Sequence, residues 1–214
     1  MSLYRAGSPA RVYVGDALAS AVYKGTVKVW QRDPSTEGGT QSVTLTVPAY
    51  AAFADVGVIG GGGGGATADN GITTSNGEGG NASSWRTATI PVKPGDTITI
   101  TIGNGGAGGS GGAKRNGAAG GASTATGPAG LNLNAPGGTG GVGSTTNDDT
   151  TGHGAAAVTV NGTVFPGSSN VTAGQPGSQF GGGGGGGPYP GWVSSPAAGG
   201  TGAKGGYQIV WRSY

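Results

Sequence analysis

The chain has 214 residues, of which 53 are glycine and only 9% are charged, whereas typical domains hold roughly 7% glycine and about 25% charged residues. The formal net charge of +2, with 11 Lys and Arg in total, supplies too few cations for a phosphate backbone, so nucleic-acid binding is not expected. Cysteine is absent, which excludes disulfides and thiolate metal sites, and no run approaches the roughly 18 apolar residues of a membrane span.

Glycine at this level is often a sign of disorder, but other features of the composition favour a folded chain. Disordered segments combine high net charge with few aromatic residues. This chain is nearly neutral and holds 4 Trp, 7 Tyr and 3 Phe. At the N-terminus, residues 1–5 lead into no apolar segment of the kind that a signal peptide needs. We therefore expect a folded protein that is made in a cytoplasm and is not secreted.

Residues 1–32 contain a repeat with a ten-residue step. The sequence Val-Tyr-x-Gly occurs at residues 12–15 and again at 22–25, and residues 27–30 add a third strand-like piece. Their β-branched and aromatic side chains, separated by turn residues, predict a small β-meander. Such a unit is marginally stable alone, so we expect it to dock on a partner protein or on its own copies.

Residues 33–40 are polar and rich in turn-forming residues, and we place a linker there between the N-terminal unit and a glycine-rich domain at 41–214. No segment of that domain shows a sustained 3.6-residue period, and glycine opposes helix formation. Alternating apolar residues predict strands instead, and Asn161-Gly162 predicts a type I′ hairpin turn. The expected fold is all-β and sandwich-like, with strands at residues 42–47, 53–59, 85–92, 97–102, 157–160, 163–165 and 207–214.

Two uninterrupted glycine tracts occupy residues 60–65 and 181–187. Ordering glycine costs more backbone entropy than ordering any other residue, and these tracts have no side chains to offset that cost. Extended three-residue-per-turn helices can pack closely where glycine occupies the crowded positions. We therefore expect a lattice of extended polyglycine segments beside or on top of the sandwich. The alternative is that the tracts are long exposed loops.

The sequence offers no convincing catalytic, cofactor or metal site. Residues 108–112 match G-x-S-x-G, but in a segment this rich in glycine the match is expected by chance, and no helix follows it. Residues 147–149 with His153 lack the alternating oxygen ligands that calcium prefers. We expect a protein that is not an enzyme and carries no cofactor or metal.

Aromatic residues near the second glycine tract have two interpretations. Tyr189 and Trp192 follow the tract, and Trp85 lies at the start of an expected strand. Aromatic side chains on a preformed backbone suit contacts with sugars or proteins. The other interpretation, which we prefer, is that these rings pack as core against the lattice.

Two motifs resemble a known family. Thr46-Val47-Pro48-Ala49, followed by a strand that runs into a glycine tract, and residues 92–103, with Pro-Gly-Asp between strands, are similar to the glycine-rich domain of phage tail proteins. Residues 1–30, with the two Val-Tyr-x-Gly pieces and Val29-Trp30, resemble the N-terminal segment of minor tail proteins from phages of mycobacteria and their relatives.

This resemblance implies a structural protein at the tip or fibre of a phage tail, made in the host cytoplasm and located in the virion. Its implied partners are other tail proteins, further copies of itself as a homotrimer, and a glycan or protein of the host envelope. Tyr13, Tyr23 and Trp30 would contribute to virion attachment, and Trp85, Tyr189 and Trp192 to surface binding.

Two other functions stay open at this point. One is a purely architectural virion protein, such as a capsid decoration or a trim of the tail or baseplate, without receptor binding. The other is a glycine-rich protein of the eukaryotic cell-wall type, against which the absence of a signal sequence argues.

Overall fold

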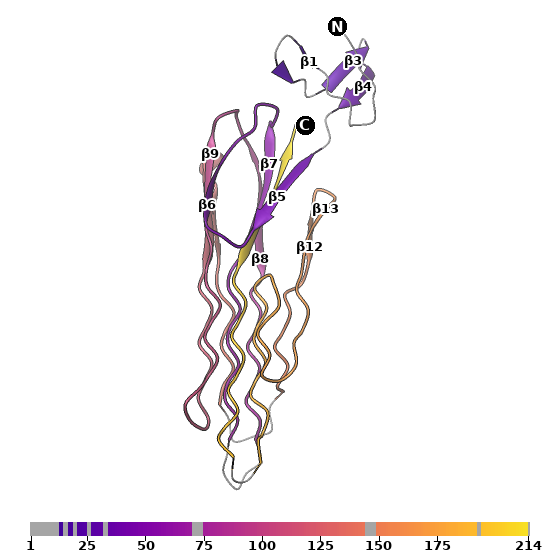
Figure 1. Ribbon diagram of the computed structural model, residues 1–214. Helices are drawn as coiled ribbons and strands as arrows, with labels where there is room; N and C mark the ends of the chain where they lie inside the picture. Colours follow the sequence, from indigo (N-terminus) through magenta and orange to yellow (C-terminus); the bar gives the residue numbers. More distant parts are fainter. Residues whose placement is uncertain are drawn as a thin grey trace.

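The computed structural model describes residues 13–14, 17–18, 21–24, 27–31, 34–69, 75–143, 149–191 and 194–213. Within these residues the fold is all-β, as predicted, apart from the short 3-10 turn η1 (Pro128–Gly130). Two four-stranded antiparallel sheets lie face to face (Figure 1), with strand orders β5-β14-β7-β8 and β11-β10-β9-β6. Their strands are β5 (Ser35–Gly39), β6 (Val43–Thr46), β7 (Phe53–Ile59), β8 (Trp85–Pro91), β9 (Thr97–Thr101), β10 (Ser123–Thr126), β11 (Asn132–Ala135) and β14 (Gly206–Arg212).

The hydrophobic core lies between these two sheets. In β9 the isoleucines point inward and the threonines outward, as the alternation of the sequence predicts. Ile98 and Ile100 pack in one cluster with Val56 of β7 and Trp211 of β14, all at most 1% exposed. Burial of such side chains contributes roughly 1.5–3 kcal/mol each, so this cluster is the main apolar contribution to stability.

A hairpin of β12 (Val158–Val160) and β13 (Thr163–Phe165) covers the outer face of the first sheet. Its turn has φ values of 46° at Asn161 and 81° at Gly162, which is the predicted type I′ geometry. The ring of Phe165 occupies the space beside Gly57, where a β-carbon would lie 2.3 Å from the ring. Glycine at position 57 therefore allows the hairpin to seat against β7.

The strand at residues 35–39 differs from the linker expected there. β5 pairs antiparallel with β14, from Ser35 opposite Trp211 to Gly39 opposite Tyr207. It lies at the edge of its sheet, where a strand is paired on one side only and tolerates polar and glycine residues. Strands β10 and β11 were also not predicted, because they are short and have small or polar residues where longer apolar ones usually mark a strand.

The N-terminal strands form two separate hairpins, so the expected meander is divided into two units. β1 (Tyr13–Val14) pairs with β2 (Ala17–Leu18), and β3 (Ala21–Lys24) pairs with β4 (Val27–Gln31). These strands lie beyond the end of the sandwich at which β14 terminates (Figure 1). Within the described part of the chain, no helix has the length and apolar character needed to cross a membrane.

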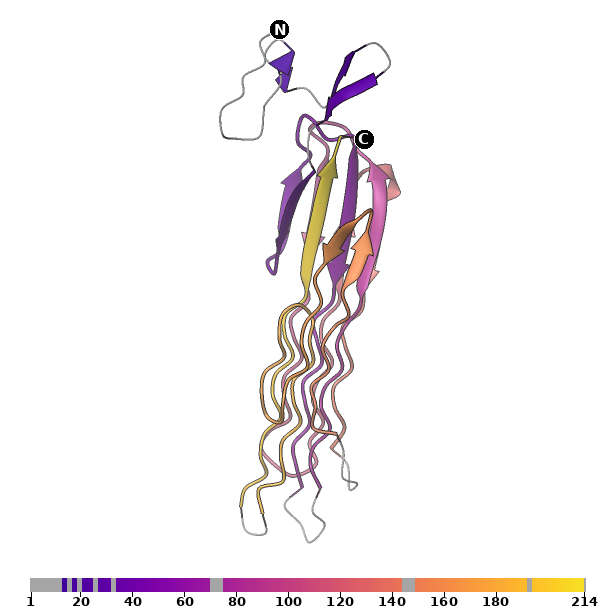
Figure 2. The same cartoon turned by 90° about the vertical axis from the view of Figure 1, so that its right-hand side faces the viewer.

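At the opposite end, the strands continue without a break into glycine-rich segments that run side by side away from the sandwich (Figure 2). β7 leads directly into residues 60–66, which contain the first glycine tract, β9 into residues 103–109, and β11 into residues 136–143. Residues 77–83, 117–122 and 199–205 return toward the sandwich and enter β8, β10 and β14. We refer to these six segments, together with residues 181–187, as the glycine lattice.

The glycine lattice and its tips as the candidate functional site

The central segment of the glycine lattice, residues 60–66, has every backbone N–H engaged. Gly60 N donates to Ser83 Oγ at 2.9 Å. The six N–H groups that follow, from Gly61 to Ala66, each donate to a backbone carbonyl at 2.8–2.9 Å. These backbone hydrogen bonds thus offset the entropy cost of ordering the glycine tract, which has no side chains that could do so.

Six segments surround this central one. Residues 77–83, 117–121 and 199–205 run antiparallel to it and accept hydrogen bonds from its N–H groups. Residues 103–109, 136–141 and 181–187 run parallel to it and donate to its carbonyls. The same neighbour recurs every three residues, as when Gly61 and Gly64 donate to the segment at 117–121. This repeat is that of a polyproline-II-type helix with three residues per turn.

The packing leaves no room for side chains inside the lattice. A β-carbon on Gly61 would lie 2.1 Å from the carbonyl oxygen of Asn104, one on Gly62 would lie 2.0 Å from that of Gly182, and one on Gly63 would lie 2.0 Å from that of Thr139. Each of these oxygens belongs to a different neighbouring segment. The predicted polyglycine lattice is therefore confirmed, and the exposed-loop alternative is wrong for the first tract.

The second tract, residues 181–187, is the other interior segment. All of its glycines are buried, and all seven of its N–H groups donate to backbone carbonyls. A β-carbon on Gly183 would lie 1.9 Å from the carbonyl oxygen of Gly80, and one on Gly184 would lie 2.2 Å from that of Gly200. Uninterrupted glycine thus marks the two segments that are enclosed on all sides.

The rim of the lattice follows a three-residue pattern that the sequence reasoning missed. In residues 104–112 and 136–143, one side chain is followed by two glycines, or by one at the end of the run. The side-chain positions are exposed, as at Asn104, Ala107 and Thr139, whereas the residue directly before each of them is buried. The x-Gly-Gly repeat in the sequence could have predicted these rim segments. A helix with three residues per turn places one residue of each triplet toward solvent, and only that position has room for a side chain.

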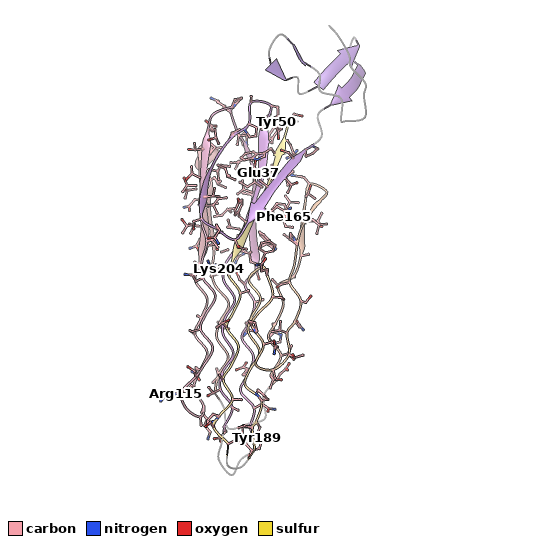
Figure 3. All side chains as sticks on the ribbon, in the orientation of Figure 1. Glu37, Tyr50, Arg115, Phe165, Tyr189 and Lys204 are labelled. Carbon is pink, nitrogen blue, oxygen red and sulfur yellow. The ribbon has the colours of Figure 1, made fainter. Side chains whose placement is uncertain are left out.

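The ends of these segments far from the sandwich form the lattice tips, near which Arg115 and Tyr189 lie (Figure 3). The buried hydroxyl of Thr67 donates to the Gly112 carbonyl at 2.9 Å and accepts from Arg115 N at 2.7 Å. An ion pair at 3.1 Å joins Lys114 to Asp69. These contacts hold the turn at residues 110–115 against the end of the central segment.

Two of the candidate binding residues, Trp85 and Tyr189, lie in different parts of the molecule. Tyr189 is half-buried at the tips, where its backbone N–H donates to Asn76 Oδ1 at 2.8 Å. Trp85 instead lies at the junction of sandwich and lattice, at the start of β8. Trp192 lies outside the described residues. Tyr13, Tyr23 and Trp30 belong to β1, β3 and β4, of which only the backbone is described.

Trp85 takes part in an aromatic cluster. Its ring centroid lies 5.5 Å from that of Phe165 in a T-shaped arrangement and 6.1 Å from that of Phe180. Its indole Nε1 donates to the carbonyl of Pro166 at 2.9 Å. These contacts join the hairpin β12–β13, strand β8 and the entrance to the second glycine tract.

A buried charged network lies under the hairpin. Asp55 of β7 is fully buried, and its carboxylate accepts from Arg212 Nε at 2.7 Å, Thr89 Oγ1 at 2.7 Å and Asn161 Nδ2 at 2.7 Å. Burial alone raises the pKa of this carboxyl, but the hydrogen bonds and the Arg212 charge outweigh it and hold the pKa below 3.8. The arrangement secures the hairpin turn to the sheet through Asn161.

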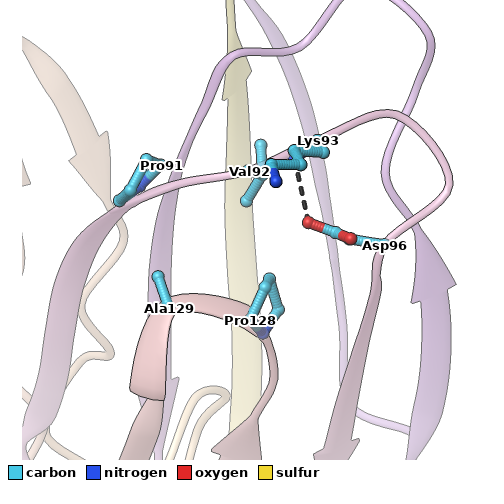
Figure 4. Close-up of a pocket in the computed structure, with 6 residues that line it drawn as sticks. All are labelled: Pro91, Val92, Lys93, Asp96, Pro128 and Ala129. Carbon is cyan, nitrogen blue, oxygen red and sulfur yellow. Dashed lines mark hydrogen bonds between the residues drawn. The ribbon is translucent and has the colours of Figure 1, made fainter.

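A pocket of about 430 Å³ lies at the end of the sandwich away from the lattice (Figure 4). Its lining is mostly apolar and includes Pro91, Val92 and Pro128. The carboxylate of Asp96 accepts from Lys93 N at 2.9 Å and so closes the turn between β8 and β9. The pocket thus lies beside the β8–β9 turn, and the Asp96 carboxylate that lines it is hydrogen-bonded within that turn.

Of the motifs weighed for catalysis and metal binding, the described side chains lie exposed on the lattice surface, whereas residues 147 and 148 lie outside the described residues. Ser110, the serine of the G-x-S-x-G match, is exposed on the rim between glycine segments, without the strand-to-helix turn that a nucleophile elbow needs. Exposed Asp149 accepts from Thr151 N at 2.9 Å. Among the described residues, no group of three or more His, Asp or Glu side chains is placed to hold a metal ion.

A β-sandwich whose strands continue into a polyglycine lattice defines a glycine-rich structural domain. The family model described as glycine-rich domain matches residues 35–212, and the chain belongs to this family. The match begins at the first residue of β5 and ends at the last residue of β14. No curated protein matches the chain.

Proposed function

We propose that this chain is a non-enzymatic structural component of a bacteriophage tail, located at the tail tip or fibre, where it contributes to attachment to the host surface. The observation that carries the proposal is the glycine lattice. It consists of backbone packed against backbone, and its interior glycines leave no space for a side chain at the central segment. Such a structure is suited to hold its tips in fixed positions.

The arrangement of the two ends supports this role. The N-terminal hairpins lie at one end of the molecule and the lattice tips at the other (Figures 1 and 2). A protein that attaches to a particle through one end and displays loops at the other needs this polarity. The resemblance of residues 1–30 to minor tail proteins, and of residues 92–103 to glycine-rich tail domains, supplies the virion context.

The attachment role is tested with the full chain, labelled with a fluorophore, on cells of the host. We expect the parent chain to bind, and Tyr189→Ala and Trp192→Ala to weaken binding, because large aromatic side chains give contact area at low entropic cost. Val164→Ala is the matched control, since Val164 is a 59% exposed apolar residue on the β12–β13 hairpin, away from the tips. Equal binding by all four proteins would exclude Tyr189 and Trp192 as binding residues.

The virion context is tested separately by gold labelling of purified particles with antibodies to the chain. Label at the end of the tail supports the proposal, and absence of the chain from particles contradicts it. If the chain is present in the particle but the parent protein does not bind cells, the architectural role without receptor binding is the better account.

A further inference from the structure

The sequence contains five Asn-Gly steps, at Asn70, Asn76, Asn104, Asn116 and Asn161. An asparagine followed by glycine is prone to cyclise, because the glycine N meets no β-carbon on its approach to the side-chain carbonyl. Whether a given step reacts depends on how firmly the amide side chain and the glycine N–H are held. All except Asn70 lie in the described part of the chain.

Asn76 is held at both reacting groups. Its Oδ1 accepts from Tyr189 N at 2.8 Å, which fixes the side chain toward the tip. The N–H of Gly77 donates to the Gly187 carbonyl at 2.9 Å, inside the lattice. Cyclisation at this step would break both hydrogen bonds.

Asn116 is held in the same way. Its Oδ1 accepts from Gly143 N at 2.8 Å, and the N–H of Gly117 donates to the Gly141 carbonyl at 2.9 Å. The side chain and the following amide are therefore both hydrogen-bonded to the lattice segment at residues 136–143.

Asn161 is held through its side-chain nitrogen. Nδ2 donates to Asp55 Oδ1 at 2.7 Å and to Thr89 Oγ1 at 3.0 Å. Loss of this nitrogen as ammonia would remove one donor from the buried Asp55 carboxylate and one from the Thr89 hydroxyl, and ring opening would place a new carboxylate beside Asp55. The step is thus protected by the network under the hairpin.

Asn104 differs from these three. It is exposed on the lattice rim, and within the described residues its side-chain amide has no hydrogen-bond partner, nor has the N–H of Gly105. The one hydrogen bond at this peptide unit is accepted by the Asn104 carbonyl from Gly121 N at 2.8 Å. Both reacting groups are accordingly free.

We propose that Asn104 is a site of spontaneous deamidation in the folded protein. Gly105 N attacks Cγ of Asn104, the new N–C bond closes a five-membered succinimide, and Nδ2 leaves as ammonia with the proton from the amide. Water then opens the ring at either carbonyl, which yields aspartate or isoaspartate at position 104.

The two products act differently on the lattice. Aspartate adds a charge on the solvent side and leaves the backbone path unchanged. Isoaspartate inserts a methylene into the main chain directly before Gly105, whose β-carbon position lies 1.9 Å from the Gly202 carbonyl oxygen. The next residue, Gly106, donates to the Gly62 carbonyl at 2.8 Å. An inserted atom shifts this register and loosens the segment at 103–109 from the central one.

The test is incubation of the full-length protein in mildly alkaline buffer, with peptide mapping by mass spectrometry over time and an isoaspartate-specific methyltransferase assay. We expect conversion at Asn104 to be at least about fivefold faster than at Asn76, Asn116 or Asn161, because each of these three must break at least one hydrogen bond and a bond of typical net strength is worth about that factor. Asn104→Ala, which keeps a small side chain on the rim, should remove most of the isoaspartate formed at these four positions.

The same incubation in denaturant provides the comparison, because there the four steps should react at similar rates. Equal or faster conversion at any of the three held residues in the folded protein would overturn the proposal. So would an Asn104 that stays intact in the folded protein while it reacts in the denatured one.

Discussion

The carbonyl oxygen of Gly182 lies 2.0 Å from the point that a β-carbon on Gly62 would occupy. Three residues further along both segments, the carbonyl oxygen of Gly185 lies 2.1 Å from the corresponding point on Gly65. Real β-carbons do not approach an oxygen so closely, so a substitution at either glycine must separate the two segments. The two glycine tracts therefore contact each other through backbone alone.

Gly62→Val and Gly184→Val should each destabilise the protein severely. The added side chain forces neighbouring segments apart and leaves several buried amides and carbonyls without partners, at about 1–3 kcal/mol each. Several such losses approach the roughly 5–15 kcal/mol stability of a whole domain. The measurement is the thermal midpoint by circular dichroism.

Gly112→Val is the matched control for these two variants. A β-carbon at Gly112 would meet only the flexible side chain of Arg115, with the nearest atom at 3.4 Å, so the midpoint should change little. An unchanged midpoint for Gly62→Val and Gly184→Val would contradict the close backbone packing of the glycine lattice.

The sequence is informative about the lattice because an ordered glycine tract can be stabilised only by close packing of its backbone. Runs at 60–65 and 181–187 predicted the two interior segments, and the Thr-Ile alternation at 97–102 predicted β9. Strands β5, β10 and β11 escaped prediction, since backbone pairing with β14 and β9 defines them more than their side chains do. The sequence also did not predict that Trp85 lies in the aromatic cluster, because only the tertiary fold brings Phe165 and Phe180 close to it.

Trp85→Ala should lower stability rather than remove a binding contact. The half-buried ring packs on Phe165 and Phe180, so we expect a loss of about 2–3 kcal/mol, below the roughly 3–5 kcal/mol of a fully buried tryptophan. Trp85→Phe keeps the packing and removes the hydrogen bond to Pro166, and should lose only about 0.5–1.5 kcal/mol. Urea denaturation of both variants measures their free energies of unfolding, and Trp85→Ala should lose more than Trp85→Phe. Full stability of Trp85→Ala together with lost cell binding would favour the surface-binding interpretation.

The Asp55 network should make stability depend on acid. The pKa of Asp55 in the folded protein is held below its ordinary value of 3.8, so the network stabilises the fold above that value, and the contribution is lost as pH falls through the lower folded pKa. Asp55→Asn leaves Arg212 without its buried charge partner and should destabilise by about 3–5 kcal/mol at neutral pH. Its stability should also change less than that of the parent between about pH 5 and pH 2, the range in which such carboxylates titrate. A parallel acid dependence in parent and variant would exclude Asp55 as the cause.

Self-association as a homotrimer is the expected assembly state, by analogy with the threefold symmetry common in phage fibres. Sedimentation equilibrium of the full chain at micromolar concentration should give three times the 20.2 kDa chain mass. A monomer under these conditions would contradict a trimer that forms outside the particle.

Deletion of residues 1–32 should separate folding from incorporation into particles. Strands β1 to β4 pair only within their own hairpins, whereas β5, which begins at Ser35, belongs to the sandwich. The shortened chain therefore keeps both four-stranded sheets, and its thermal midpoint should equal that of the parent. If the N-terminal hairpins attach the chain to the virion, particles assembled with the shortened chain should lack it.

Deletion of residues 1–40 is the informative comparison, because it also removes β5. This strand pairs along β14 from Ser35 to Gly39, and Glu37 Oε1 accepts from Trp211 Nε1 at 2.9 Å. Its loss exposes an edge of the sheet and leaves a core indole without its acceptor, so the midpoint should fall. Normal incorporation of the chain that lacks residues 1–32 would refute the attachment role of the hairpins. A lowered thermal midpoint for the chain that lacks residues 1–32 would mean that the hairpins contribute to the stability of the sandwich.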